Sequence, residues 1–299
     1  MGKISVVINT LNEEKNLPRA LASVKYFADE IVVCDMYSDD KTVEIAKNAG
    51  AKIYEHEKTG YVEPARDYAI GKAQRDWVLI LDADEEISSS LKTELKSITA
   101  KPSADFYRLP RKNIIFGKWI KHSRFWPDYN IRFFRKGYVA WSEIIHSVPE
   151  TKGKGFDLEA KEENAIIHHH YETIEQFVER LNRYTTEHAK LLSKEGYNFN
   201  WTDLIQKPTN EFLGRYFQGE GYKDGLHGLA LSGLQAFSEF VMYLKLWQML
   251  GFKADHVDIE ETVNEMKEIE ADLHYWQSDA LLKEVGGLKH RVKRKFRLP

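Results

Sequence analysis

Residues 77–86, WVLILDADEE, form the stretch on which the fold depends. The first five are mostly apolar and predict a strand that is buried on both faces. Four carboxylates follow at the carboxyl end of that strand, where they repel one another and lose hydration. A divalent cation would offset that cost, because Mg²⁺ and Mn²⁺ prefer carboxylate oxygens together with phosphate oxygens. We therefore expect a metal–diphosphate site at Asp82 and Asp84.

The same acids also fit a second interpretation, in which they cap the helix that follows. Ser88 and Ser89 come directly after them, and serine is a preferred residue at the start of a helix. Two aspartates separated by one residue do not distinguish these interpretations, so the segments upstream have to decide between them.

Upstream of this stretch, apolar strands alternate with helices. The predicted strands are Ile4–Ile8, Ile31–Cys34, Lys52–Tyr54 and Trp77–Leu81, and the predicted helices are residues 12–24, 42–49 and 63–73. Such alternation with short connections predicts an α/β fold with a parallel sheet. No G-x-G-x-x-G motif follows the first strand, which argues against a dinucleotide-dependent dehydrogenase.

Polar residues follow three of the predicted strands and are expected to meet at one edge of the sheet. They are Thr10, Asn12 and Glu14 after the first strand, Asp35 and Ser38 after the second, and Asp82 and Asp84 after the fourth. Asn12 is also expected to cap the first helix. Asp35 could accept the imide N–H of a uracil, so these residues predict a nucleotide site.

Arg66 lies in the first turn of the third predicted helix, where the helix dipole disfavours a cation. A guanidinium at this position makes more sense if it binds a diphosphate. A solvated surface arginine is the alternative.

Three passages together resemble family 2 glycosyltransferases, which have a GT-A fold. They are residues 5–24, SVVINTLNEEKNLPRALASV, residues 30–51, EIVVCDMYSDDKTVEIAKNAGA, and residues 76–88, DWVLILDADEEIS. The resemblance implies that Asp35 binds the base of a UDP-sugar, Asp82 the ribose or metal, and Asp84 a Mg²⁺ or Mn²⁺ ion. The chain departs from the family pattern at Met36 and Tyr37, where a small residue and glycine are common.

The middle of the chain resembles a subgroup of that family that builds the lipopolysaccharide inner core, described as β-1,4-glucosyltransferases. The shared pattern is carried by Arg111 with Asn113, Gly117 with Trp119, Pro127 with Asp128, Arg132 with Arg135, and Trp141 with His146. This resemblance implies transfer of a hexose, expected to be glucose, to a glycan or lipid-linked saccharide. Acceptor or sugar contacts are expected from Trp119, Trp126, Arg132 and His146, because aromatic faces pack against pyranose rings; core packing is the alternative for the tryptophans.

An inverting transferase needs a general base near the acceptor hydroxyl. Glu143 is the first candidate, because it follows a hairpin predicted from Ile131–Arg135 and Tyr138–Trp141, and Asp128 is the second. An exposed turn residue is the alternative for Glu143. His168 fits the register H-x-x-Y with Tyr171, and by the family resemblance it would be a further metal ligand; a solvated histidine is the alternative.

The last third of the chain has a helical texture. We expect domains at residues 1–171 and 172–299, the second with long helices at 175–194, 226–250 and 257–284. The basic tail Lys289–Arg297 could contact anionic lipid, or could simply be solvated. No apolar run reaches the roughly 18 residues of a membrane-spanning helix.

Composition restricts the partners and the compartment. The net charge of −3 gives no sign of nucleic-acid binding, and Cys34, the single cysteine, cannot form a disulfide within the chain. The predicted strand at Ile4 leaves no room for a signal peptide. These features predict a cytoplasmic protein, peripheral at the inner face of a membrane if the tail binds lipid.

Two other functions also fit parts of the pattern. A sugar nucleotidyltransferase uses similar acidic metal ligands but needs a Gly-rich loop bearing Lys or Arg after the first strand, where this chain has residues 11–14, LNEE. A non-catalytic sugar-binding protein would explain Met36 and Tyr37 but not the pair of Asp82 and Asp84.

Overall fold

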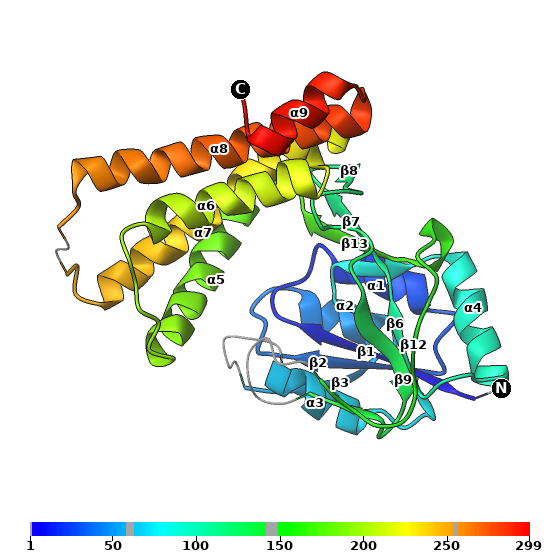
Figure 1. Cartoon of the computed structure of the whole chain (residues 1–299). Coiled ribbons are helices and arrows are strands. Elements are labelled where there is room, and N and C mark those ends of the chain that lie inside the picture. The colour runs from blue at the N-terminus through cyan, green and yellow to red at the C-terminus, as the bar shows by residue number, and fades with distance from the viewer. Residues whose placement is uncertain (1, 58–62, 142–148, 254–255) are drawn as a thin grey trace. The chain divides into compact units, whose positions relative to one another are not determined.

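The computed structural model describes residues 2–57, 63–141, 149–253 and 256–299 (Figure 1). The chain divides into two compact units, which we call the sheet unit and the helical unit. The sheet unit comprises residues 1–114 and 127–170, and the helical unit comprises residues 115–126 and 171–299. The sequence predicts a single boundary after residue 171. In the structure, residues 115–126 also belong to the helical unit.

The sheet unit is built on seven strands in the order β12-β6-β9-β4-β1-β2-β3. Their bounds are β1 Ile4–Thr10, β2 Glu30–Asp35, β3 Lys52–Glu55, β4 Trp77–Ile80, β6 Phe106–Leu109, β9 Asn130–Arg135 and β12 Gly155–Asp157. β1 lies between β2 and β4 and is parallel to both, and β2 is parallel to β3. The predicted α/β class with a parallel-rich GT-A sheet is therefore confirmed.

Four helices cover the two faces of this sheet, α1 Leu17–Val24, α2 Thr42–Asn48, α3 Glu63–Lys72 and α4 Ser89–Ala100. Successive side chains of β1 point to opposite faces of the sheet. Val6 and Ile8 pack in the core with α1, α2 and α4, whereas Val7 packs with α3 on the other face. Every residue of β1 is buried, which explains why a run of β-branched residues is required there.

The predicted hairpin between Ile131–Arg135 and Tyr138–Trp141 is wrong. β9 instead lies between β4 and β6 and is antiparallel to both. β10, Val139–Ala140, pairs with β11, Glu150–Thr151. Phe133 and Phe134 are both fully buried, on opposite faces of the strand. A strand in the middle of a sheet can bury side chains on both faces, whereas an isolated two-stranded hairpin is marginally stable.

A second, smaller sheet contains β5, β13 and β7 as neighbours. Their bounds are β5 Glu85–Ile87, β13 Ile166–Tyr171 and β7 Arg111–Ile115, and a short 3₁₀ turn, Glu162–Asn164, precedes β13. β13 runs antiparallel to β5 and places His168 opposite Glu85. This pairing brings the histidine segment to the acidic stretch that follows β4.

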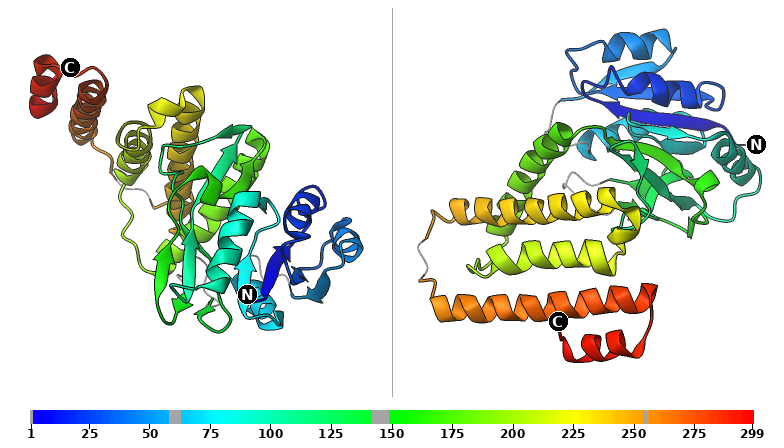
Figure 2. Two further views of the ribbon diagram at one scale, coloured as in Figure 1. Left: turned by 90° about the vertical axis from the view of Figure 1, so that its right-hand side faces the viewer. Right: turned by 90° about the horizontal axis from the view of Figure 1, so that it is seen from above.

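The helical unit contains β8 Lys118–Trp119, α5 Ile174–Lys194, α6 Asp203–Leu213, α7 Leu226–Met249, α8 Ile259–Glu284 and α9 Leu288–Phe296, with single turns at Gly214–Gln218 and Gly221–Asp224. α7 contacts both α5 and α6, and α8 contacts α9 (Figure 2). Thr173 and Gln176 form a capping box that starts α5. Among the described residues, no helix is both long and apolar enough to cross a membrane.

Candidate functional site

Asp35 ends β2 beside Thr10, the last residue of β1, and its carboxylate is held by three hydrogen bonds. Thr10 Oγ1 donates to Oδ1 over 2.9 Å, Ser38 Oγ donates to the same oxygen over 2.6 Å, and the Ser38 backbone N–H donates to Oδ2 over 2.8 Å. Asp35 is only 2% exposed. The carboxylate is therefore fixed in position and keeps further acceptor capacity for a ligand.

Asn12 and Glu14 join the loops that follow β1 and β2. The Asn12 backbone N–H donates to Ser38 Oγ over 2.8 Å, and its side-chain oxygen accepts from the Asp39 N–H over 2.9 Å. Glu14 accepts from the Lys41 N–H over 3.2 Å. The expectation that Asn12 caps the first helix is wrong, because α1 begins only at Leu17 and the Asn12 side chain is committed to this loop.

The turn after β2 has Tyr37 at the position where glycine is common in the family pattern. Tyr37 adopts a φ of 60°, a left-handed conformation that glycine reaches without steric cost, and its ring is exposed. The backbone at this position therefore explains why glycine is common there in the family pattern, and it shows that tyrosine is tolerated.

Asp82 lies between two arginines. Arg66 Nη2 of α3 is 2.7 Å from Oδ1, and Arg132 Nη2 of β9 is 2.5 Å from Oδ2. Burial opposes ionisation of this carboxyl, but Arg132 and Arg66 outweigh it and hold the pKa of Asp82 well below its ordinary value. Because cations of the chain already contact both oxygens, Asp82 has less negative charge to offer a metal than its sequence motif indicates.

Glu85 is the functional-site residue that the sequence reasoning missed. It is fully buried, its Oε2 accepts the Asp82 backbone N–H over 2.9 Å, and its Oε1 lies 2.8 Å from Arg132 and 3.3 Å from Arg111. The helix start does not use these acids, since Ser88 Oγ accepts the Leu91 N–H and caps α4. The only available signal was the excess of carboxylates in the stretch DADEE.

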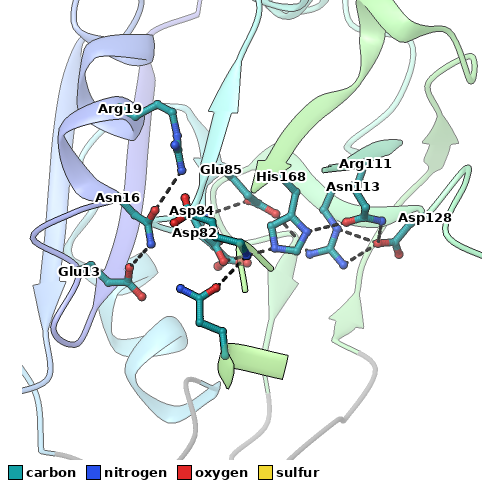
Figure 3. A network of polar contacts seen from close by, with 12 residues as sticks. Glu13, Asn16, Arg19, Asp82, Asp84, Glu85, Arg111, Asn113, Asp128 and His168 are labelled. Carbon is teal, nitrogen blue, oxygen red and sulfur yellow. Dashed lines mark hydrogen bonds and ion pairs between the residues drawn. The ribbon is translucent and has the colours of Figure 1, made fainter. Parts of the chain in front are cut away.

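A chain of contacts leads from Asp128 to Asp84 (Figure 3). Asp128 Oδ2 accepts from Asn113 Nδ2 over 3.1 Å, so the Asn113 oxygen faces His168, whose Nδ1 lies 2.6 Å away. An amide oxygen can only accept, so His168 Nδ1 carries the proton. His168 Nε2 then faces Asp84 Oδ2 at 3.4 Å. In the neutral imidazole that nitrogen presents a lone pair to a carboxylate, an arrangement that a shared cation would stabilise.

Asp128 itself is also bound by Arg111, whose Nε and Nη2 lie 2.8 and 2.6 Å from Oδ2. Burial alone would raise the pKa of Asp128, but Arg111 and Asn113 lower it below its ordinary value. A lower pKa makes a carboxylate a weaker base, and this geometry favours a positioning role over proton transfer.

The donor set around Asp84 fits a small divalent cation in part. Among residues 2–57, 63–141, 149–253 and 256–299, no group of three or more His, Cys, Asp or Glu side chains is arranged to hold a metal. Asp84 and His168 supply one carboxylate oxygen and one imidazole nitrogen, both suitable for Mn²⁺. The remaining ligands would have to come from a bound diphosphate and water, as is usual for Mg²⁺.

The residues predicted to contact a sugar do not form one group in the described structure. Trp119 and Trp126 belong to the helical unit and contact each other edge to face, with ring centroids 5.2 Å apart. Glu143 and His146 lie outside the described residues. Arg132 is in the sheet unit, but its guanidinium contacts Asp82 and Glu85 and it is only 3% exposed.

A cavity of about 650 Å³ lies within the sheet unit next to the two arginines that hold Asp82. Besides Arg66 and Arg132, the aromatic rings that line it are Phe106, Tyr129, Trp141 and Phe156. The Arg66 guanidinium also lies 5.7 Å from the Trp141 ring centroid. Aromatic faces beside guanidinium groups suit a polar ring-shaped ligand such as a sugar.

Comparison with known proteins gives this arrangement a context. Residues 5–156 match the family model described as glycosyl transferase family 2. An uncharacterized glycosyltransferase of Rickettsia typhi is 35% identical over 258 residues, which cover 83% of this chain and 88% of that protein. An uncharacterized glycosyltransferase of Rickettsia prowazekii is 33% identical over 266 residues, which cover 86% of this chain and 90% of that protein.

Among solved structures, S. aureus TarS 1-349 in complex with UDP is similar with a TM-score of 0.46 and 16% identity, over 86% of this chain and 94% of that one. The sequence relatives and the family model carry the assignment of an enzymatic class, and the predicted resemblance is confirmed at that level. The chain belongs to glycosyltransferase family 2 and is a glycosyltransferase.

Proposed function

We propose that the protein is an inverting, metal-dependent transferase that moves a hexose, glucose in the first instance, from a UDP-sugar to a glycan or lipid-linked saccharide such as a lipopolysaccharide core. The observation that carries this proposal is the convergence of strand ends in the sheet unit. β1 pairs with β2 and with β4, all in parallel, so Thr10, Asp35 and the acidic stretch at Asp82 follow at the same edge.

The nucleotide is assigned to the residues after β1 and β2. Asp35 would accept the imide N–H of uracil, a donor that cytosine lacks at that ring position, while Thr10 and Ser38 keep its carboxylate oriented. Asn12 and Glu14 would shape the wall of this site. Asp82 would accept a ribose hydroxyl, a role compatible with its two arginine contacts.

The diphosphate is assigned to Asp84, His168 and Arg66. Asp84 and His168 would hold Mg²⁺ or Mn²⁺, which when bound supplies positive charge to the departing diphosphate. Arg66 would add a second positive charge, which its ion pair with Asp82 holds in a fixed position. Asn113 fixes the tautomer of His168, and Asp128 fixes Asn113, so these two residues position a metal ligand.

In the transfer step, the acceptor hydroxyl oxygen attacks the anomeric carbon from the face opposite the diphosphate. The bond from that carbon to the diphosphate oxygen breaks, UDP leaves, and a base takes the hydroxyl proton. We assign the base to Glu143 and retain Asp128 as the second candidate, although its guanidinium contacts and lowered pKa disfavour it.

The acceptor is assigned to the cavity beside Arg66 and Arg132, where a sugar ring would stack on Trp141 or Tyr129. Trp119, Trp126 and His146 remain proposed sugar contacts. We also propose that the protein works in the cytoplasm, peripheral to a membrane that carries the acceptor.

Calorimetry of nucleotide binding tests this function. We expect UDP to bind in the presence of Mn²⁺ at least about tenfold more tightly than in EDTA, and more tightly than GDP, because the base contact at Asp35 and the metal contact act together. UTP as the preferred ligand would favour a nucleotidyltransferase. Binding of free hexose without any UDP binding would favour a sugar-binding protein.

Replacing Glu143 by glutamine should leave UDP affinity unchanged and lower the turnover number by about 100-fold or more, the usual effect of losing a general base. Release of UDP from UDP-glucose with acceptor present measures turnover. The matched variant Asp128→Asn should lower turnover less than Glu143→Gln does. It should instead weaken Mn²⁺-dependent binding of UDP, because it disturbs the contact between Asn113 and His168. Normal turnover in Glu143→Gln would move the base to another residue.

A further inference from the structure

α9, Leu288–Phe296, presents its apolar side to solvent. Leu288, Val292 and Phe296 follow one another at intervals of four and so share one face of the helix. They are 74%, 43% and 61% exposed. An amphipathic helix that packs on a protein normally buries such a face, so this orientation is the reverse of the usual one.

The polar side of α9 is the side that contacts the protein. Arg294 Nη1 lies 2.7 Å from Asp279 of α8, and Arg297, just after the helix, lies 2.8 Å from Asp272. The Arg297 guanidinium also lies 6.0 Å from the ring centroid of Tyr275. These three α8 residues are spaced three and four apart and share a face, so α9 is attached to α8 through charges.

Cations border the apolar face on both sides. Lys289, Arg291 and Lys295 are all exposed, and Lys295 lies next to the apolar face, 5.4 Å from the Phe296 ring centroid. An apolar stripe between rows of cations is the pattern of helices that lie in the interface of an anionic membrane. In that position the apolar side chains enter the acyl boundary while the cations meet phosphate groups.

We propose that α9 is an interfacial anchor that inserts Leu288, Val292 and Phe296 into an anionic lipid surface. A second copy of the chain is a weaker candidate for the occupant. A nine-residue helix with three apolar side chains covers far less than the roughly 800 Å² per partner of a stable interface. The flanking cations of two α9 helices would also repel each other. The proposal deepens one part of the proposed function, the membrane-linked acceptor.

Flotation of the full chain with lipid vesicles tests this anchor. We expect binding to vesicles of phosphatidylglycerol and phosphatidylcholine, and at least about tenfold weaker binding to phosphatidylcholine alone. The triple variant Leu288→Ser, Val292→Ser, Phe296→Ser should reduce binding to the anionic vesicles by about tenfold or more. The variant Lys289→Gln, Arg291→Gln, Lys295→Gln should do the same, because both elements are needed.

The chain offers a matched control on α8. Ile259, Val263 and Met266 are exposed at 71%, 41% and 54%, with helical spacing, but acids such as Glu260 and Glu261 neighbour them. Serine at these three positions should leave vesicle binding unchanged. Undiminished binding by the α9 serine variant would overturn the proposal, and so would a dimer, seen by sedimentation, that this variant dissociates. UDP calorimetry on the same proteins reports the donor site separately, so failure of the anchor and failure of the proposed function remain distinguishable.

Discussion

Replacing Asp84 by asparagine is expected to abolish the Mn²⁺-dependent part of UDP binding and to lower sugar transfer by about 100-fold or more. Asp84 Oδ2 and His168 Nε2 face each other at 3.4 Å, and these two side chains are the metal ligands that we propose. Asparagine keeps the size of the side chain but removes the negative charge, which is the property that binds a divalent cation. Charge stabilisation of a leaving group by a metal commonly contributes several kcal/mol, hence the size of the effect.

Glu86→Gln is the matched control for this variant. Glu86 belongs to the same acidic stretch and lies 3.0 Å from the neighbouring histidine, His169. Both substitutions remove one carboxylate charge from a histidine pair, but only Asp84 is assigned to the metal. We expect Glu86→Gln to change Mn²⁺-dependent UDP affinity by less than about threefold. Equal losses of Mn²⁺-dependent UDP affinity in both variants would show a general effect of charge. Unchanged affinity in Asp84→Asn would contradict the assignment of Asp84 to the metal.

Replacing Arg132 by methionine is expected to destabilise the sheet unit by about 3–5 kcal/mol, because it removes the buried guanidinium that Asp82 and Glu85 share and leaves Glu85 with its longer contact to Arg111. The side chains of Arg132 and Glu85 are 4% and 0% exposed, and the same guanidinium binds Asp82. The free energy of unfolding, measured in urea at pH 7, gives the loss. The control is Arg108→Met, whose pair with Asp157 is 49% and 41% exposed and should contribute about 1 kcal/mol or less.

The effect of Arg132→Met should also depend on pH in a defined direction. Arg132 and Arg66 hold the pKa of Asp82 in the folded state well below its unfolded value near 3.9. Such a group contributes stability above the unfolded pKa, and this contribution is lost as the pH falls toward the folded pKa. The difference between the wild type and Arg132→Met should therefore be largest near neutral pH and shrink below about pH 4. A difference that is independent of pH would contradict the ionic explanation.

Local patterns allowed much of the sheet unit to be predicted. β4 is a continuous apolar run, and β1 is mostly apolar apart from Ser5, Asn9 and Thr10. Both strands are buried along their whole length, and the acidic stretch follows β4 as expected. The register H-x-x-Y with Tyr171 singles out His168 from its neighbours, and β13 places it opposite Glu85. The position of β9 could not be predicted, since the apolar segment Ile131–Arg135 fits a hairpin as well as a central strand, and only long-range pairing with β4 and β6 decides.

The contacts of Glu85 with arginines could not be predicted from local sequence either, because they also join segments far apart along the chain. Glu85 looks like one more acid in a row, and its role depends on Arg132 and Arg111, which are 47 and 26 residues away along the chain. The direction in which α9 faces is equally unpredictable. Its sequence shows an apolar stripe and many cations, but the contacts of Arg294 and Arg297 with α8 are needed to show that the stripe faces outward.

The position of the cation in a complex with Mn²⁺ and UDP tests the central claim most directly. Anomalous diffraction at the manganese absorption edge locates the ion independently of the protein atoms. We predict a single peak bonded to Asp84 and to diphosphate oxygens, with His168 as a further ligand and the uracil ring against Asp35. A manganese peak away from Asp84, or a uracil ring that does not reach Asp35, would contradict this assignment of the site.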